Sequence, residues 1–109
     1  MRAQPQITFL NMPHSEAAEA LIRENVEKLN TFYDGILNCQ VVVDVPHRRH
    51  QEGNQYEVRI VLSVPGNDII ISRTPDEQTA NQDLRQAIRD AFDAAGRRLQ
   101  DYVRRRRGQ

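Results

Sequence analysis

The sequence predicts a single α+β domain with the element order β-α-β-β-β-α. Residues 16–33 and 79–105 carry apolar side chains at the spacing of an amphipathic helix. Between them, residues 39–45 and 56–64 alternate apolar and polar side chains, as strands with one solvated face do. We therefore expect one four-stranded, mostly antiparallel sheet with both helices packed on one face, a two-layer sandwich.

The first two elements are a short strand at residues 7–10 and a helix. Ser15 is the expected N-cap, because a serine hydroxyl accepts a hydrogen bond from a backbone amide of the first helical turn. Asp34 and Gly35 end the helix. The predicted apolar stripe of this helix comprises Ala18, Leu21, Ile22, Val26, Leu29, Phe32 and Tyr33.

Three strands follow, which we expect at residues 39–45, 56–64 and 68–72. Pro46 ends the first of them, and a tight turn at residues 65–68 joins the other two. Cys39 is interpreted as a small core residue rather than a nucleophile. The opening strand of the chain lies beside the first or the second of these three, and the sequence leaves that choice open.

The last helix is predicted over residues 79–105 with a continuous apolar stripe. The stripe comprises Leu84, Ala87, Ile88, Ala91, Phe92, Ala95, Leu99, Tyr102 and Val103. Gly96 lies beside this stripe, where the missing side chain allows a close approach to the sheet. We expect residues 104–109 to fray.

Composition excludes several classes of protein. A chain of 109 residues can bury a core without disulfides or metal. No apolar run approaches the roughly 18–20 residues that cross a bilayer, and the first residues lack the apolar core of a signal peptide. A lone cysteine fits a reducing compartment. We therefore expect a cytoplasmic protein without membrane association.

Charge is zero in sum but divided along the chain. Fifteen Lys and Arg residues balance fifteen Asp and Glu residues. Residues 1–46 hold three cations and six acids, for −3, and residues 94–109 hold six arginines and one acid, for +5. Fourteen of the fifteen cations are arginine, whose planar fork binds phosphate in two places. A GC-rich genome produces the same excess, so this bias has two readings.

Two basic features are candidates for phosphate binding. Arg85, Arg89, Arg97 and Arg104 lie near one face of the last helix, opposite its apolar stripe. The predicted loop His47-Arg48-Arg49-His50 is the other. Its two histidines lack a carboxylate or thiol to complete a metal site, and the arginines repel a cation. For both features the alternative reading is a solvated surface.

No pattern predicts catalysis. The serines lack a nucleophile-elbow setting, and no glycine-rich loop precedes a helix. The acids are scattered as helix-face partners rather than paired at strand ends. We therefore expect no enzyme, no catalytic residue, no metal, no cofactor and no small-molecule substrate.

Two motifs resemble the ribosome hibernation-promoting factor family, also called YfiA (RaiA) or sigma-54 modulation proteins. The first is Lys28-Leu29-Asn30-Thr31-Phe32-Tyr33-Asp34-Gly35-Ile36, which closes the first helix. The second begins at Gln82-Asp83-Leu84 and continues through Ala87-Ile88 to Arg97 and Leu99. Both occur in the family's order and cover nearly the whole chain. The shape also resembles the double-stranded-RNA-binding fold.

The resemblance implies binding to small-subunit rRNA near the mRNA and tRNA channel. Family members block translation and preserve idle ribosomes in stationary phase or stress. By position, Lys28 and Arg97 match family cations, and residues 104–107 fall in the family's basic stretch. The full candidate RNA-binding set is Lys28, Arg48, Arg49, Arg85, Arg89, Arg97, Arg98, Arg104, Arg105, Arg106 and Arg107.

The sequence departs from the family in two ways. Glu19, Glu24 and Glu27 stand on the first helix where well-characterised members are neutral or basic. The chain lacks the C-terminal extension of long-form members, so we expect a short-form factor.

Two other functions remain open. One is a protein-interaction module of the same fold that no longer binds the ribosome and binds a protein partner through the exposed sheet face or the acidic first helix. The weaker one is a metal-dependent RNA hydrolase using His47 and His50. We expect a monomer in the first reading.

Overall fold

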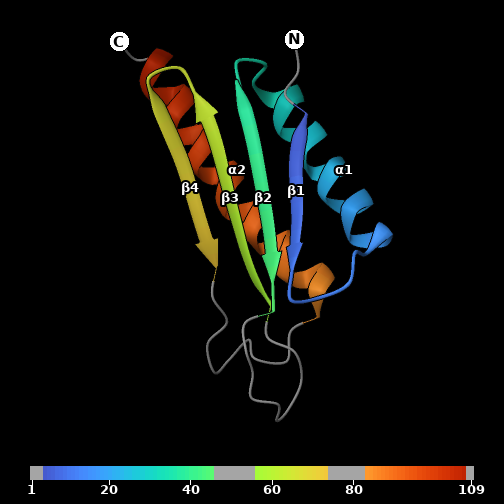
Figure 1. The fold of residues 1–109 in the computed structure, drawn as a ribbon. Coiled ribbons are helices and arrows are strands. Elements are labelled where there is room, and N and C mark those ends of the chain that lie inside the picture. Colours follow the sequence, from blue (N-terminus) through green and yellow to red (C-terminus); the bar gives the residue numbers. More distant parts are fainter. Residues whose placement is uncertain (1–3, 46–55, 74–82, 108–109) are drawn as a thin grey trace.

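A computed structural model describes residues 4–45, 56–73 and 83–107 of the chain. The elements are β1 (Pro5–Leu10), α1 (Glu16–Phe32), β2 (Asn38–Asp44), β3 (Glu57–Val64), β4 (Asn67–Arg73) and α2 (Leu84–Arg107). The strands form one sheet in the order β1-β2-β3-β4, and both helices lie against the same face of it (Figure 1). The predicted two-layer α+β architecture is confirmed.

The partner of β1, which the sequence left open, is β2, and the two strands run parallel. The pairs β2–β3 and β3–β4 are antiparallel. Parallel neighbours need a long crossover connection, and α1 supplies it. In the helix layer, α1 packs beside β1 and against α2, while α2 covers β3 and β4.

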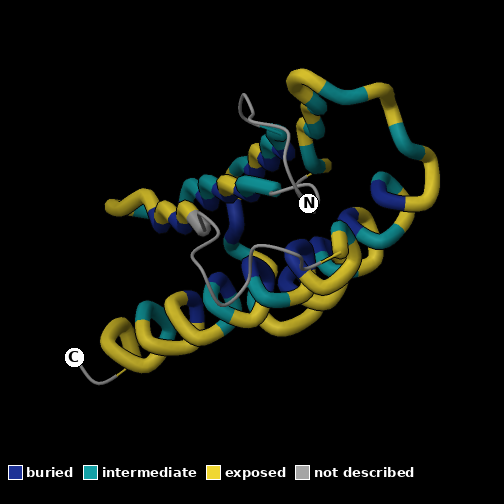
Figure 2. The backbone as a smooth tube through the Cα atoms, turned by 90° about the horizontal axis from the view of Figure 1, so that it is seen from below, coloured by how far each residue is buried: buried dark blue, intermediate teal, exposed yellow. Residues whose placement is uncertain are grey.

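The core lies between the sheet and the two helices. Burial alternates along β2 and β3, so one side of each strand faces the helices and the other side faces outward (Figure 2). Cys39 is fully buried at the start of β2, which confirms its interpretation as a core residue. Burial raises the pKa of its thiol to about 11, so the group stays protonated at neutral pH.

The first helix begins and ends largely as predicted. The Ser15 Oγ accepts a hydrogen bond of 3.1 Å from the Ala18 amide, which confirms the N-cap. The predicted stripe is wrong at Phe32, whose side chain is 50% exposed. The helix ends at Phe32, and the extended Tyr33 packs against the core instead.

The turn between β3 and β4 falls in the predicted segment but is shorter than predicted, because β4 already begins at Asn67. Pro65 and Gly66 join the strands, and Gly66 has φ +80°, a left-handed conformation that glycine adopts without strain. The strand that follows carries three successive isoleucines. Ile69 and Ile71 are buried, whereas Ile70 points to the other side of the sheet and is 46% exposed.

The last helix differs from its prediction at both ends. It begins at Leu84, after Asp83, whose Oδ1 accepts a 2.8 Å hydrogen bond from the Gln86 amide as an N-cap does. The expected start at residue 79 lies outside the described residues, and Asp83 itself is not helical. At the other end, the helix continues through Arg107, past the position where we expected fraying.

Candidate nucleic-acid interface

All eight candidate arginines of α2 are exposed. They are Arg85, Arg89, Arg97, Arg98, Arg104, Arg105, Arg106 and Arg107. The helix is fixed to the sheet by its opposite side, where the buried residues are Ala87, Ile88, Ala91, Phe92, Ala95 and Leu99. Figure 2 shows the sheet-facing side of α2 as buried and its outer side as exposed, and all eight arginines are among the exposed residues, together with Asp93 and Asp101.

Three of these arginines contact neighbours in the protein. The Arg98 Nη1 donates a long hydrogen bond of 3.5 Å to the Ile70 carbonyl oxygen on β4. The Arg104 Nη1 lies 3.5 Å from an Asp101 carboxylate oxygen. Arg106 lies over the ring of Tyr102, with 5.5 Å between the guanidinium carbon and the ring centroid.

The other five make no hydrogen bond or ion pair to another residue in the described part of the chain. These are Arg85, Arg89, Arg97, Arg105 and Arg107. An exposed guanidinium presents five N–H donors in a planar fork, and phosphate oxygens match that geometry. Within the described part of the chain, these side chains therefore have no hydrogen bond or ion pair to break before they bind an anion.

One flank of α2 is turned toward α1. Gly96 marks this flank, because a Cβ atom built on it would lie 4.0 Å from Leu29 Cδ2 on α1. The expected approach of Gly96 to the sheet is therefore wrong, since the glycine faces the neighbouring helix. Arg85 and Arg89 lie eleven and seven residues before Gly96, so helical periodicity sets them on the same flank.

Lys28, the candidate cation of α1, shares a flank with the partly buried Leu21, seven residues earlier. The opposite flank holds Glu19, whose carboxylate lies 2.9 Å from His14 Nε2. His14 in turn packs edge-to-face on Phe9 of β1, with ring centroids 5.2 Å apart. Because the Glu19 flank is turned toward β1, the flank of Lys28 is turned toward α2.

The acids of α1 are arranged so that few of them oppose the arginines. Glu19 is paired with Arg23 at 2.9 Å, in addition to its contact with His14. Glu27 falls on the same side of the helix as Arg23, away from Lys28. Of the three acids that depart from the family pattern, Glu19 and Glu27 therefore lie away from α2, whereas Glu24, four residues before Lys28, lies on the same side as Lys28.

Two tyrosines anchor the C-terminal part of α2. The Tyr102 hydroxyl donates a 2.7 Å hydrogen bond to the Pro65 carbonyl oxygen in the β3–β4 turn. Tyr33 meets the Tyr102 ring edge-to-face, with centroids 5.8 Å apart. Burial and then contact with Tyr102 raise the pKa of Tyr33. Gly35 leaves room for this arrangement, because a Cβ on it would lie 2.5 Å from the Tyr33 hydroxyl.

This anchor was not predicted from the sequence. Tyr102 was counted only as a member of the apolar stripe, and no local pattern links it to Pro65, which lies 37 residues away. The usable signal was chemical: a tyrosine at the edge of an apolar stripe needs a partner for its hydroxyl. The same contacts hold the helix in place where Arg104 and its neighbours project.

The predicted basic loop lies outside the described residues. Arg48 and Arg49, with His47 and His50 beside them, fall in the undescribed segment. Among the described residues, no group of three or more His, Cys, Asp or Glu side chains is arranged to hold a metal ion. In that same part of the chain, no helix is both long and apolar enough to cross a bilayer.

Two solved structures illustrate the likeness of the fold. One is the N-terminal domain of protein Y from Thermus thermophilus, with TM-score 0.70 and 18% identity over 94% of this chain and 99% of that one. The other is a ribosomal subunit interface protein from Coxiella burnetii, with TM-score 0.72 and 16% identity over 91% of this chain and 96% of that one. At these identities the likeness establishes the fold.

The family is established by the sequence itself. No curated protein matches the chain. However, the family model described as sigma 54 modulation protein / S30EA ribosomal protein matches residues 6–107. This match spans every described helix and strand except the first residue of β1, and it agrees with the family that the two motifs indicated. The chain therefore belongs to the sigma 54 modulation protein / S30EA ribosomal protein family.

Proposed function

We propose that the protein binds rRNA of the small ribosomal subunit near the mRNA and tRNA channel. By occupying that site it inhibits translation or preserves idle ribosomes under stress or in stationary phase. It acts in the cytoplasm as a monomer, without a catalytic step, a cofactor or a small-molecule substrate. The observation that carries this proposal is the set of exposed arginines on α2, five of which have no hydrogen-bond or ion-pair partner among the described residues, in a member of a ribosomal protein family.

The interface consists of the outer and α1-facing sides of α2 together with Lys28. Phosphate contacts position a protein on RNA, and exposed guanidinium groups form them without rearrangement of the fold. Arg97 is the central member, because it is exposed, has no partner among the described residues and matches a cation of the family. Arg48 and Arg49 belong to the proposal through their sequence alone.

Co-sedimentation with purified small subunits over a series of salt concentrations tests the proposal. Arg97→Glu should lower the affinity about tenfold and reduce the dependence of log affinity on log salt by about one. The matched control is Arg59→Glu on β3, which makes the same charge change on the opposite side of the sheet. It should leave subunit binding unchanged.

Two results would contradict the proposal. If the unaltered protein fails to sediment with small subunits even at low salt, a protein-interaction module of the same fold becomes the better reading. If Arg59→Glu weakens binding as much as Arg97→Glu does, the α2 surface is not the interface.

A further inference from the structure

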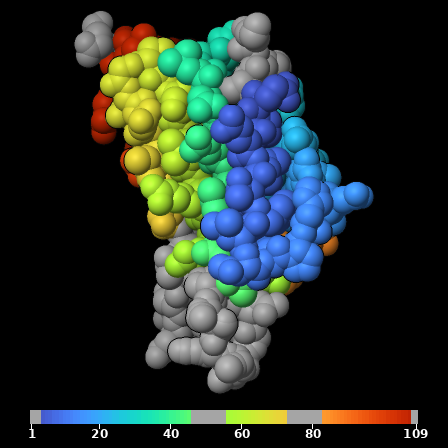
Figure 3. All heavy atoms as spheres, viewed as in Figure 1, coloured from blue at the N-terminus to red at the C-terminus, as the bar shows by residue number. Residues whose placement is uncertain are grey.

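The side of the sheet opposite the helices is open. No element of the described chain packs on it, and Figure 3 shows its surface running across all four strands. Four apolar side chains on this side are exposed or half-buried, namely Leu10, Val42, Val61 and Ile70. In a sheet with one solvated face, this side would ordinarily carry polar residues. The open face is therefore more apolar than solvation requires.

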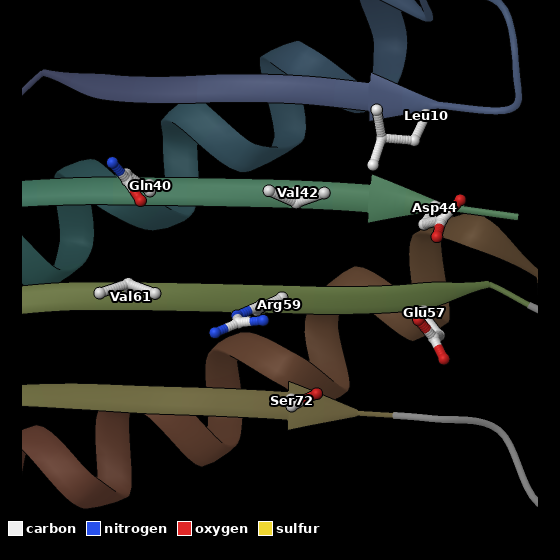
Figure 4. A pocket seen from close by; sticks show the side chains of 8 residues that line it. All are labelled: Leu10, Gln40, Val42, Asp44, Glu57, Arg59, Val61 and Ser72. Carbon is white, nitrogen blue, oxygen red and sulfur yellow. The ribbon is translucent and has the colours of Figure 1, made fainter. Parts of the chain in front are cut away.

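A hollow of about 420 Å³ lies on the open face, and side chains from all four strands line it (Figure 4). Leu10, Val42 and Val61 supply apolar surface. Asp44 and Glu57 lie together at one end, and Arg59 lies between them and Val61 along the strands. The hollow thus combines an apolar area with an acidic end.

The two acids face each other across neighbouring strands. Asp44 of β2 is the direct partner of Glu57 of β3 in the register. Like charges in directly opposite positions destabilise a sheet. The arrangement therefore lowers the stability of the sheet. A cation bound between the two carboxylates would turn this repulsion into a net attraction.

Asp44 is also held in position. The Asn11 amide donates a 2.8 Å hydrogen bond from Nδ2 to Asp44 Oδ1. Asn11 has φ +61°, in the left-handed region that few residues other than glycine adopt, although asparagine does so more readily than most. A residue in an uncommon backbone conformation thus orients one carboxylate of the acidic end.

The charge of the open face decides which partner it suits. Asp44, Glu57 and Asp68 carry three negative charges on this side and Arg59 carries one positive charge, for −2. RNA phosphates are repelled by such a surface, whereas a lysine or arginine side chain lays its aliphatic stem on apolar residues and its charge on carboxylates. Arg59 lies opposite Val42 in the register and disfavours an uninterrupted run of cations.

We propose that the open face is a docking site for an extended cationic protein segment in which basic and apolar residues alternate along one side. A basic residue binds between Asp44 and Glu57, and the next residue on that side packs on Val42 and Val61. Side chains on one side of an extended segment repeat at about 7 Å, which is the spacing from Asp44 to Val42 along β2. This face lies on the other side of the sheet from α2, so RNA and the segment bind at the same time.

Titration with a defined peptide tests the site. The probe repeats Lys-Ser-Leu-Ser over about twelve residues, roughly 40 Å when extended, so that Lys and Leu alternate on one side. Binding is followed by amide chemical shifts of the isotope-labelled protein. The Lys peptide should shift amides of β2 and β3, and a peptide with Glu in place of Lys should not.

Paired variants make the test specific. Asp44→Asn with Glu57→Gln should weaken peptide binding about tenfold. It should leave the protein folded and at least as stable as before, because it removes a repulsive pair. The matched control, Glu24→Gln with Asp93→Asn, makes the same charge change on the exposed sides of α1 and α2 and should alter binding by less than about twofold.

Four outcomes would overturn the proposal. In the first, the Lys peptide does not bind to the protein. In the second, both pairs of substitutions weaken peptide binding equally. In the third, sedimentation velocity shows self-association that the Asp44 and Glu57 variant abolishes, which would make a second copy of this chain the occupant. In the fourth, the same variant binds an RNA oligonucleotide more weakly than the unaltered protein does, which would make the open face part of the RNA site.

Discussion

The two helices of this protein use their charged residues in opposite ways. On α1, Glu19 is occupied by both Arg23 and His14, so its charge is used inside the protein. On α2, five arginines make no hydrogen bond or ion pair to another described residue. The helices lie side by side in one layer, yet α1 pairs Glu19 within the protein, whereas five of the eight arginines of α2 have no such partner among the described residues.

This difference explains how a chain with zero net charge can present a basic surface. A basic side chain near a helix C-terminus complements the helix dipole, but that effect fades within one turn. Arg85 and Arg89, which have no hydrogen-bond or ion-pair partner among the described residues, lie in the first two turns of α2, far beyond that range. Local partners, rather than the total charge, decide which side chains are available for binding.

The sharpest test removes charge from each helix separately. Arg85→Gln with Arg89→Gln should lower the affinity for small subunits by up to about a hundredfold and reduce the salt dependence by about two, because two phosphate contacts are lost. Glu24→Gln with Glu27→Gln should change the affinity by no more than about twofold. Co-sedimentation at several salt concentrations measures both.

If the α1 variant strengthens binding as much as the α2 variant weakens it, the acids of α1 face the RNA. The contrast between the helices would then be wrong, and the flank assigned to Lys28 would need revision.

Cys39 lies on the side of the sheet that the two helices cover, and its side chain is fully buried. Burial raises its pKa from 9.0 to about 11, so the folded protein holds the thiol proton more tightly than the unfolded chain does. The stabilisation is fully present below about pH 9 and declines as the pH rises toward 11, with a loss of about 1 kcal/mol at pH 10. Urea unfolding across this range should show the decline.

Cys39→Ala is the control for the alkaline decline. Its stability should fall less steeply between pH 9 and pH 10, whatever its stability at pH 7. Equal slopes for the two proteins would show that another group, such as Tyr33, dominates the titration.

A smaller effect distinguishes how the two helices are fixed at their ends. Ser15→Ala removes the cap at the start of α1, and Tyr102→Phe removes the hydroxyl that bonds to Pro65 near the end of α2. Each should lower the free energy of unfolding by about 1 kcal/mol. Hydrogen exchange should report the first change in early α1 amides and the second in the last turns of α2. Identical exchange patterns would show that the ends are not held independently.

The smallest expected effect is a gain in stability at the contact between the helices. Gly96→Ala should raise the free energy of unfolding by about 0.5–1 kcal/mol, because alanine is the better helix former. The added Cβ would lie 4.0 Å from Leu29 Cδ2, an ordinary contact distance. Thermal unfolding measures the change. A lower melting temperature would show that the two helices approach more closely than this distance indicates.

Much of the fold could be predicted because periodicity reports which side of each element is buried. It does not report neighbours, and so the partner of β1 stayed open. The long helix between β1 and β2 could have settled this, because a helix of that length is the crossover connection that two parallel neighbouring strands need. Phe32 was misjudged because apolar character alone does not show where a helix ends.

The candidate site was predictable only in part. The sequence identified a basic side of the last helix, and the structure exposes every arginine predicted there. It could not show which of them have partners, because the contact of Arg98 with Ile70 joins residues 28 positions apart. The proposed role of these side chains in binding rRNA stays a prediction that the salt-dependent binding experiments address.

The length of α2 has a consequence for the entropy of binding. Its 24 residues extend about 36 Å, whereas the eight residues of β3 extend about 27 Å. The helix is therefore longer than the sheet, and the hydrogen bond from Tyr102 to Pro65 fixes it close to the edge of the sheet. Arg104–Arg107 therefore belong to a regular helix rather than to an irregular terminal segment. This segment therefore loses little backbone freedom when a partner binds it, so more of the free energy of each contact appears as affinity.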